Sequence, residues 1–219
     1  MKLIDEALKE HHFVKIDEVE TTQFYIREEG KAIRFVILHR LDVLSNPIEL
    51  NTQINELAPT LFINNPAFKK NCDLICIHKL DQLAEFKQCE EQIFAIEEDP
   101  HFFKKYILYY SDTEEKALDN KSYKDIKNII SDKKQFNEYK DQPIVATQYS
   151  VAAKIFIKLP FLDLPFNKRD LVPLRLQAES AVHEVGLTEI YKNIQELKKT
   201  NLDFIINGMI NDELENIKD

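Results

Sequence analysis

The chain has 219 residues, of which 44% are hydrophobic and 31% charged, and its formal net charge is −9. This length fits one large domain or two small ones, and the hydrophobic fraction is sufficient for a core. Phosphate repels a uniformly acidic protein, so the charge argues against direct DNA binding unless a local basic patch exists. A protein partner suits this charge better.

Three cysteines without regular spacing argue against a disulfide framework and fit a reducing cytosol. No apolar signal segment follows Met1, and no apolar run reaches the length of a membrane span. We therefore expect a cytoplasmic protein.

The first third of the chain predicts a helix and a hairpin. Residues 2–10 have apolar side chains at helical spacing, which is typical of a short amphipathic helix. Residues 21–27 alternate between polar and β-forming side chains, and residues 32–38 are almost entirely apolar. Gly30 lies in the turn between them, so the two segments predict an antiparallel hairpin. Because the second strand is nearly all apolar, we expect it to be central in a sheet and covered on both faces.

A helix is expected next, because Asn46 is a suitable N-cap and Pro47 suits the first helical position. Three further elements follow it: a strand over 73–79, a helix over 81–96 and a strand over 106–110. The predicted order is β-β-α-β-α-β. It indicates an α+β fold, with an N-terminal mixed sheet of about four strands and flanking helices, followed by a helical C-terminal part.

The character of the sequence changes after Ser111. Residues 112–142 are charged and mostly helical in pattern, and Pro143 marks a possible boundary. We therefore divide the chain into an α+β domain, 1–142, and a mainly helical C-terminal subdomain, 143–219.

A buried helix is favoured over 144–159, and an irregular apolar loop follows it. This loop contains Phe161 and Leu162 and is too apolar to face open solvent, so we expect it to lie against the core or a partner.

From residue 171 onward the pattern is helical, and Gly186 suits the C-terminal cap of one of these helices. The last helix is expected from Asn201, with Ile206, Met209 and Ile210 in its apolar stripe. Such a helix either enters the groove of a partner or packs on the preceding helix and completes the chain's own core. The pattern leaves both alternatives open.

Common catalytic motifs are missing: the sequence has no phosphate-binding loop, no G-x-S-x-G and no H-E-x-x-H. The enzymatic alternative is a degenerate or active metal-dependent nuclease of the restriction-endonuclease type. Such a site sets an acid on one strand and acid-x-Lys on the next to hold Mg²⁺ against phosphate. Asp73 opens a strand that ends at Lys79, and Asp17 or Glu20 precedes the hairpin. The acid-x-Lys step is missing after Asp73, and acids at strand ends are common turn residues.

The acidic run Glu97, Glu98 and Asp99 ends a predicted helix, where acids oppose the helix dipole. A compensating cation is therefore expected, either Lys104 or Lys105 just beyond the turn or an arginine of a partner protein. The run could instead bind a divalent cation, or simply be a solvated helix end.

Two aromatic residues, Phe103 and Tyr106, flank the entry into the strand that follows this turn. We expect them to be structural and to fill the core on opposite sides of the strand.

The segment I-E-E-D-P-H-F-F-K-K-Y-I-L-Y-Y, residues 96–110, and the strand D-L-I-C-I, residues 73–77, carry a family resemblance. Together they resemble the middle component of bacterial ABC three-component systems, which include the Lamassu-type anti-phage and anti-plasmid defence systems. The resemblance is specific over about residues 70–111. Beyond Ser122 it concerns only the general helical character.

This resemblance implies a non-enzymatic adaptor. Such a subunit joins an SMC- or Rad50-like ABC ATPase, which senses DNA, to a nuclease or other effector, and it helps hold the effector inactive. It implies no catalytic residue, cofactor, metal site, membrane contact or small-molecule substrate in this chain, and DNA contact only through the complex. The candidate partner-binding residues are Glu97, Glu98, Asp99, Lys104, Lys105, Phe161, Leu162, Ile206, Met209 and Ile210.

Overall fold

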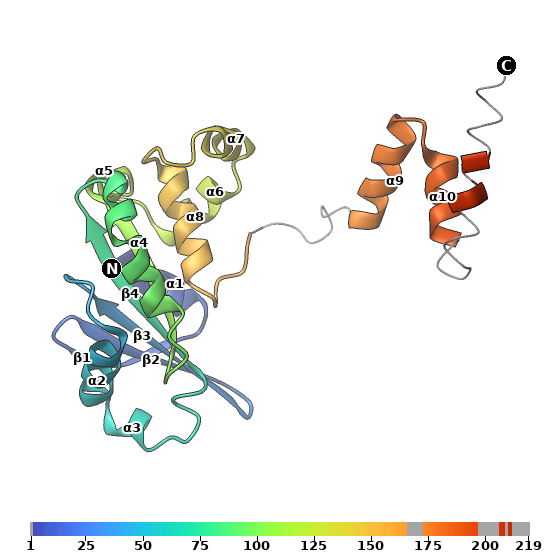
Figure 1. Ribbon diagram of the computed structural model, residues 1–219. Helices are drawn as coiled ribbons and strands as arrows, with labels where there is room; N and C mark the ends of the chain where they lie inside the picture. Colours follow the sequence, from blue (N-terminus) through green and yellow to red (C-terminus); the bar gives the residue numbers. More distant parts are fainter. Residues whose placement is uncertain (1, 166–172, 197–205, 209, 212–219) are drawn as a thin grey trace. The chain divides into compact units, whose positions relative to one another are not determined.

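A computed structural model describes residues 2–165, 173–196, 206–208 and 210–211 of the chain. The chain forms two compact units, 1–165 and 166–219, and each is described by itself (Figure 1). In the described part of both units, no helix has the length and apolar character needed to cross a membrane.

The first unit is built on a five-stranded mixed sheet in the order β1-β2-β3-β4-β5. Its strands are β1 (Val14–Val19), β2 (Thr22–Glu29), β3 (Ala32–Arg40), β4 (Cys72–Leu80) and β5 (Lys104–Ser111). The first three strands pair antiparallel, and β4 and β5 continue the sheet parallel to β3. Gly30, at a φ of +60°, turns the chain between β2 and β3. The apolar strand predicted to be central is β3, and it lies in the middle of the sheet.

One strand was not predicted. β1 pairs with β2 at the sheet edge, and nearly all its side chains are exposed. Its apolar and polar residues alternate only over residues 14–17, and the pairing with β2 shifts between Lys15 and Asp17, so the strand signal in the sequence is short. The sheet therefore has five strands, and the predicted α+β class is confirmed.

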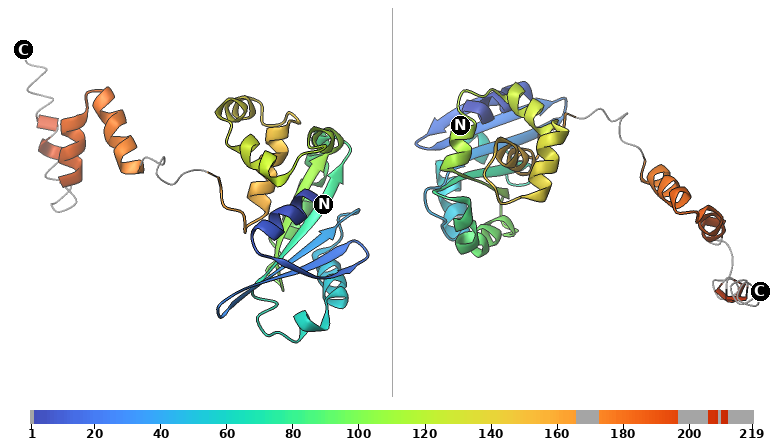
Figure 2. Two further views of the ribbon diagram at one scale, coloured as in Figure 1. Left: turned by 180° about the vertical axis from the view of Figure 1, so that it is seen from behind. Right: turned by 90° about the horizontal axis from the view of Figure 1, so that it is seen from above.

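Helices cover both faces of the sheet in the first unit. They are α1 (Lys2–Glu10), α2 (Pro47–Leu57), α3 (Thr60–Ile63), the 3₁₀ turn η1 (Leu83–Glu85), α4 (Phe86–Glu97), α5 (Asp112–Ala117), α6 (Tyr123–Ile130), α7 (Lys133–Asp141) and α8 (Gln148–Lys158). One buried cluster joins the sheet to α2, α3 and α4, and a second joins the other face to α1 and α8. Figure 2 shows α1 in front of the sheet when the molecule is viewed from behind. A third cluster packs α6 against α8.

The compact units divide at a different place from the predicted boundary after residue 142. α8 was assigned to the C-terminal subdomain, but Val151 and Ile155 are buried with sheet residues of the first unit. The predicted helix is therefore present and buried, and the first unit continues to Pro165.

The second unit contains α9 (Leu174–Glu184) and α10 (Thr188–Glu196), joined by a turn in which Gly186 has a φ of +74°. This glycine is the predicted helix terminator. Residues 206–208 and 210–211 are helical as well. The rest of the predicted last helix, including Met209, lies outside the described residues.

Candidate interaction surfaces

Lys105 is the buried centre of the turn between α4 and β5. Its side chain is fully shielded from solvent, and its Nζ atom pairs with Asp99 Oδ2 at 2.8 Å. The same atom donates to the backbone carbonyls of Asp99, His101 and Phe103 at 3.3, 2.6 and 3.2 Å. A buried ammonium is tolerated when such acceptors surround it, so Lys105 fixes the path of the turn.

Asp99 is held by three side chains. Besides Lys105, Asn51 Nδ2 donates to its Oδ2 at 2.8 Å, and His101 Nδ1 lies 2.8 Å from its Oδ1. Burial alone would raise the pKa of this carboxyl, but the hydrogen bonds from Lys105, His101 and Asn51 outweigh burial and hold the pKa well below 3.8. The expectation that a nearby lysine compensates the acidic helix end is confirmed for Lys105.

The neighbouring charges of this stretch divide into internal and surface groups. Glu97 accepts from the backbone N–H of Ile107 at 2.7 Å and pairs with Lys158 Nζ at 2.5 Å, so it ties α4 to β5 and α8. Glu98 and Lys104 are exposed. Of the five charged residues chosen as candidates, Glu97, Asp99 and Lys105 thus build the fold. Glu98 and Lys104 remain available at the surface.

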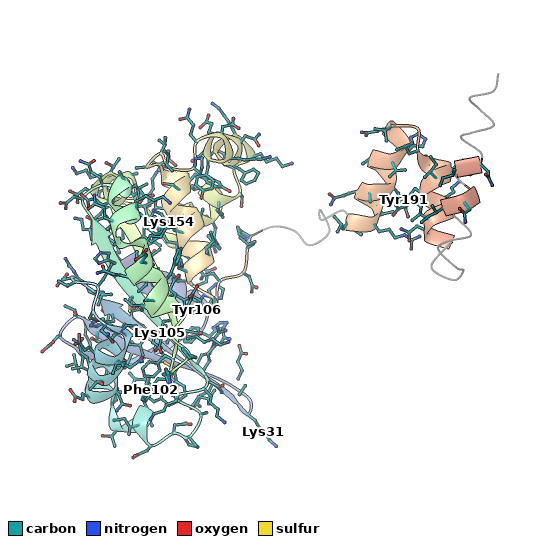
Figure 3. All side chains as sticks on the ribbon, in the orientation of Figure 1. Lys31, Phe102, Lys105, Tyr106, Lys154 and Tyr191 are labelled. Carbon is teal, nitrogen blue, oxygen red and sulfur yellow. The ribbon has the colours of Figure 1, made fainter. Side chains whose placement is uncertain are left out.

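Phe102 is the strained residue of the turn. It adopts a φ of +65°, which is uncommon for a bulky side chain, and it is 44% exposed. Lys69 Nζ lies 4.6 Å from the centre of its ring. Its neighbour Phe103 is buried against Phe68 instead. Figure 3 shows Phe102, Lys105 and Tyr106 at this end of the first unit.

The predicted sides of Phe103 and Tyr106 are correct. Phe103 belongs to the cluster beneath α2, α3 and α4, whereas the half-buried Tyr106 packs against the cluster on the opposite face.

The apolar loop after α8 lies against the core of its own unit. Phe161 is buried, with its ring centre 5.1 Å from that of Phe13 and 5.8 Å from that of His11. Leu162 is partly buried against the same cluster. Between the two alternatives for this loop, the structure places Phe161 in the core, where it has no free surface to offer a partner.

The second unit has the most exposed apolar surface among the candidates. None of the side chains described in α9 and α10 is buried. Their exposed large apolar residues are Leu174, Leu176, Val185, Leu187, Ile190 and Ile194. The candidates Ile206 and Ile210 are also exposed. Exposed large apolar side chains in this number are a feature of interaction sites when they adjoin one another.

The nuclease candidates lie apart from one another. Asp73 is nearly buried and its Oδ2 accepts from Arg34 Nε at 2.8 Å and Nη2 at 2.7 Å. Lys79, toward the other end of the same strand, pairs with Asp112 at 2.6 Å and Glu115 at 2.7 Å. Within the described residues, no group of three or more His, Cys, Asp or Glu side chains could hold a metal ion.

Two sets of charged residues were not singled out from the sequence. One is a buried network in which Glu114 accepts from Ser150 Oγ at 2.5 Å and from Lys154 Nζ at 2.6 Å. Burial lowers the pKa of Lys154, and the pairing with Glu114 opposes this shift. The other set is the pair of Arg34 with Asp73. In the sequence, the only sign of this pair is the charged Arg34 inside an otherwise apolar predicted strand.

The fold and these surfaces define an α+β unit in which the buried Lys105 and the partly buried Lys154 are paired with acids, followed by a small helical unit with exposed apolar side chains. Residues 33–134 match the family model described as ABC-three component (ABC-3C) system Middle Component 1, so this region of the chain is similar to the middle components of such systems. The matched region begins in β3 and ends in α7, so it contains the turn around Lys105 and confirms the resemblance found there. No curated protein and no solved structure matches the chain.

Proposed function

We propose that the chain is a non-catalytic adaptor subunit of a bacterial Lamassu-type complex for defence against phages and plasmids. It links an SMC- or Rad50-like ABC ATPase, which senses DNA, to a nuclease or other effector, and it helps hold that effector inactive. The site of action is the cytoplasm.

The observation that carries this proposal is the contrast in burial between the two units. The family match lies within the first unit, which has its own core. The second unit exposes leucine and isoleucine side chains on both α9 and α10. Covering apolar surface of this kind with a partner is favourable and stabilises the complex. An adaptor needs a contact region for each neighbour, and the second unit offers one of them.

Co-purification of the complex tests the proposal. Ile190 and Ile194 are four residues apart on α10 and therefore lie on one face of the helix. In the double substitution Ile190→Glu/Ile194→Glu, we expect the tagged chain to lose either the ATPase or the effector encoded beside it. The thermal transition of the first unit should stay unchanged.

Lys192→Glu is the matched control. It lies on the same helix, introduces the same side chain and changes the net charge by the same two units, but it removes only an exposed pair with Glu189. Such pairs contribute little to stability. Full assembly of the Ile190→Glu/Ile194→Glu variant would contradict the role of α10, and equal loss in the control would assign the effect to charge.

A further inference from the structure

A row of charged side chains crosses one face of the sheet at the amino ends of its parallel strands. Arg27 on β2 lies directly opposite Arg34 on β3, and Asp73 on β4 lies directly opposite Lys104 on β5. Two like charges in directly opposed positions destabilise a sheet unless something compensates them. Asp73 compensates Arg34. Arg27 pairs with the exposed Glu29 at 3.6 Å, donates to the backbone carbonyl of His11 at 3.4 Å and lies 4.9 Å from the centre of the Phe13 ring.

This row lines a hollow of about 410 Å³, to which Lys70 contributes a further cation. Four cations therefore face two acids there, and Asp73, only 5% exposed, is shielded from any ligand. Lys70 and Lys104 have no ion pair at 4 Å or less among the described residues. The hollow is a local positive site on a chain whose net charge is −9.

A second hollow, of about 510 Å³, shares Lys70 and Lys104 with the first. Its lining adds Lys69, the exposed ring of Phe102 and three acids. Two of these acids are paired, Glu97 with Lys158 and Asp99 with Lys105, and the third, Glu98, is exposed. The buried Lys105 fixes the turn that carries this ring, so Phe102 is held at the rim rather than free to collapse. The two hollows together form a basic-aromatic patch, defined here by Arg27, Arg34, Lys69, Lys70, Phe102 and Lys104.

We propose that this patch binds single-stranded nucleic acid, with phosphates at the cations and a base against Phe102. Cations spread over adjoining hollows suit the repeated charges of a nucleic-acid backbone, and an exposed aromatic ring accepts a base of any sequence by stacking. An acidic peptide would use the cations but gains no comparable contact from the ring. The patch extends beyond the adaptor role and does not rest on it.

We expect the isolated chain to bind nucleic acid only weakly through this patch. Few cations take part and the remainder of the protein repels phosphate, so the patch adds to binding that the assembled complex supplies. The sequence shows no basic-aromatic run, because the six residues come from four separate segments of the chain.

Fluorescence anisotropy of the full chain with a labelled oligothymidylate, over a range of NaCl concentrations, tests the proposal. We expect weak, saturable binding with a slope of log K against log salt near −3, from about −0.7 for each of about four contacts. Lys70→Glu/Lys104→Glu should weaken binding and make the slope shallower by about 1.4. The control Lys133→Glu/Lys134→Glu on α7 changes the net charge equally at exposed positions and should leave the slope unchanged.

Phe102→Gly tests the stacking contact separately, because glycine accepts the φ of +65° without strain. It should weaken binding by about five-fold or more at an unchanged salt slope. Phe136→Ala, at an exposed phenylalanine of α7, is the control and should have no effect.

Oligouridylate and polyglutamate separate the ligand classes. Comparable binding of oligouridylate and oligothymidylate supports recognition of backbone and base without selection of the sugar. No salt-sensitive binding of either oligonucleotide at low ionic strength overturns the proposal. A different outcome would point to an acidic protein as the ligand in place of nucleic acid. In that outcome, polyglutamate binding depends on Lys70 and Lys104 but not on Phe102, and oligonucleotide binding is unaffected in the lysine variant.

Discussion

The two units of the chain differ in how they use their apolar side chains. The first unit buries two clusters of them on the two faces of a sheet and a third between α6 and α8, whereas α9 and α10 bury none of their described side chains. Burial of apolar area is the main term that offsets the conformational entropy of a folded chain. The first unit therefore has the means to fold alone, whereas the described residues of the second unit leave their apolar side chains exposed.

The charges show the same difference. In the first unit Asp99, Lys105, Glu114 and Lys154 lie inside the fold and are paired. Among the described side chains of α9 and α10, the ion pairs are the exposed short-range pairs Arg175–Glu179 and Lys192–Glu189. A buried pair demands a unique arrangement around it, while an exposed pair contributes little. The first unit is thus specified in detail by its own residues.

The largest expected effect is on the core of the first unit. Phe103→Ala should lower the free energy of unfolding by about 3–5 kcal/mol, because Phe103 is buried in the cluster beneath α4. Urea or thermal unfolding measures the change. Phe102→Ala is the matched control at the exposed neighbour and should change stability by about 0.5 kcal/mol or less. An unchanged midpoint for Phe103→Ala, with loss of partner binding, would instead place Phe103 in an interface.

Removal of the buried charge of Lys105 should lower the free energy of unfolding slightly less than Phe103→Ala does. Lys105→Met keeps the length of the side chain but leaves Asp99 with only Asn51 and His101 as partners. Loss of one member of a buried pair costs about 3–5 kcal/mol, and the remaining partners place this case at the lower end. Urea unfolding should show Lys105→Met/Asp99→Asn to be less unstable than the two single effects summed.

The pH dependence gives this prediction a second readout. The pKa of Asp99 is lowered in the folded chain, so its contribution is fully present above the unfolded value near 3.8 and is lost as pH falls below it. The difference in stability between the wild type and Asp99→Asn should therefore be constant near neutral pH and shrink below about pH 4. A difference that grows with acid would contradict the pairing.

Much of the first unit was predictable because its signals are local. Asn46 accepts from the backbone N–H of Ile48 at 2.9 Å, as its position before Pro47 predicts, and Gly30 and Gly186 have the positive φ of turn residues. The edge strand β1 was missed because its alternation of apolar and polar residues is short and is interrupted near the shift in pairing between Lys15 and Asp17. The burial of Phe161 depends on its contact with Phe13, which is distant in sequence. The apolar composition of the loop does not identify this contact.

The basic-aromatic patch shows why the rest of the site was not predictable. Arg27 and Arg34 meet through hairpin register, and Asp73 and Lys104 meet through parallel pairing across a crossover. Each residue alone is an ordinary charge at a strand end or in a turn. Their combination exists only in three dimensions.

Truncation after Pro165 should have little effect on the first unit. We expect residues 1–165 to unfold cooperatively with a midpoint close to that of the full chain, because their three clusters remain complete. Co-purification with the complex should be lost. Aggregation of this truncated chain would show that the second unit covers part of the first.

A shorter deletion, 201–219, separates the two alternatives for the last helix. Removal of a helix that completes the chain's own core should destabilise or aggregate the protein. Removal of a partner helix should leave a cooperatively melting protein that no longer co-purifies with the ATPase or the effector. A truncated protein that is both stable and fully assembled contradicts both alternatives.

The smallest expected effect is that of Asp73→Ala on DNA cleavage. We expect no cleavage by either the wild type or this variant. Asp73, the acid of the nuclease alternative, is engaged by Arg34, and Lys79 toward the far end of β4 is engaged by Asp112 and Glu115. A restriction-endonuclease site needs an acid and an acid-x-Lys motif together around Mg²⁺. Asp73 and Lys79 are engaged in separate ion pairs and do not form such a site together. Purified wild type and Asp73→Ala should therefore both leave linear and supercoiled DNA intact with Mg²⁺ or Mn²⁺, as followed on agarose gels. Asp73→Asn, which keeps the side-chain volume beside Arg34, controls for misfolding. Cutting by the wild type that disappears in both variants would show that the first unit is an enzyme, and the second unit would then be its means of attachment.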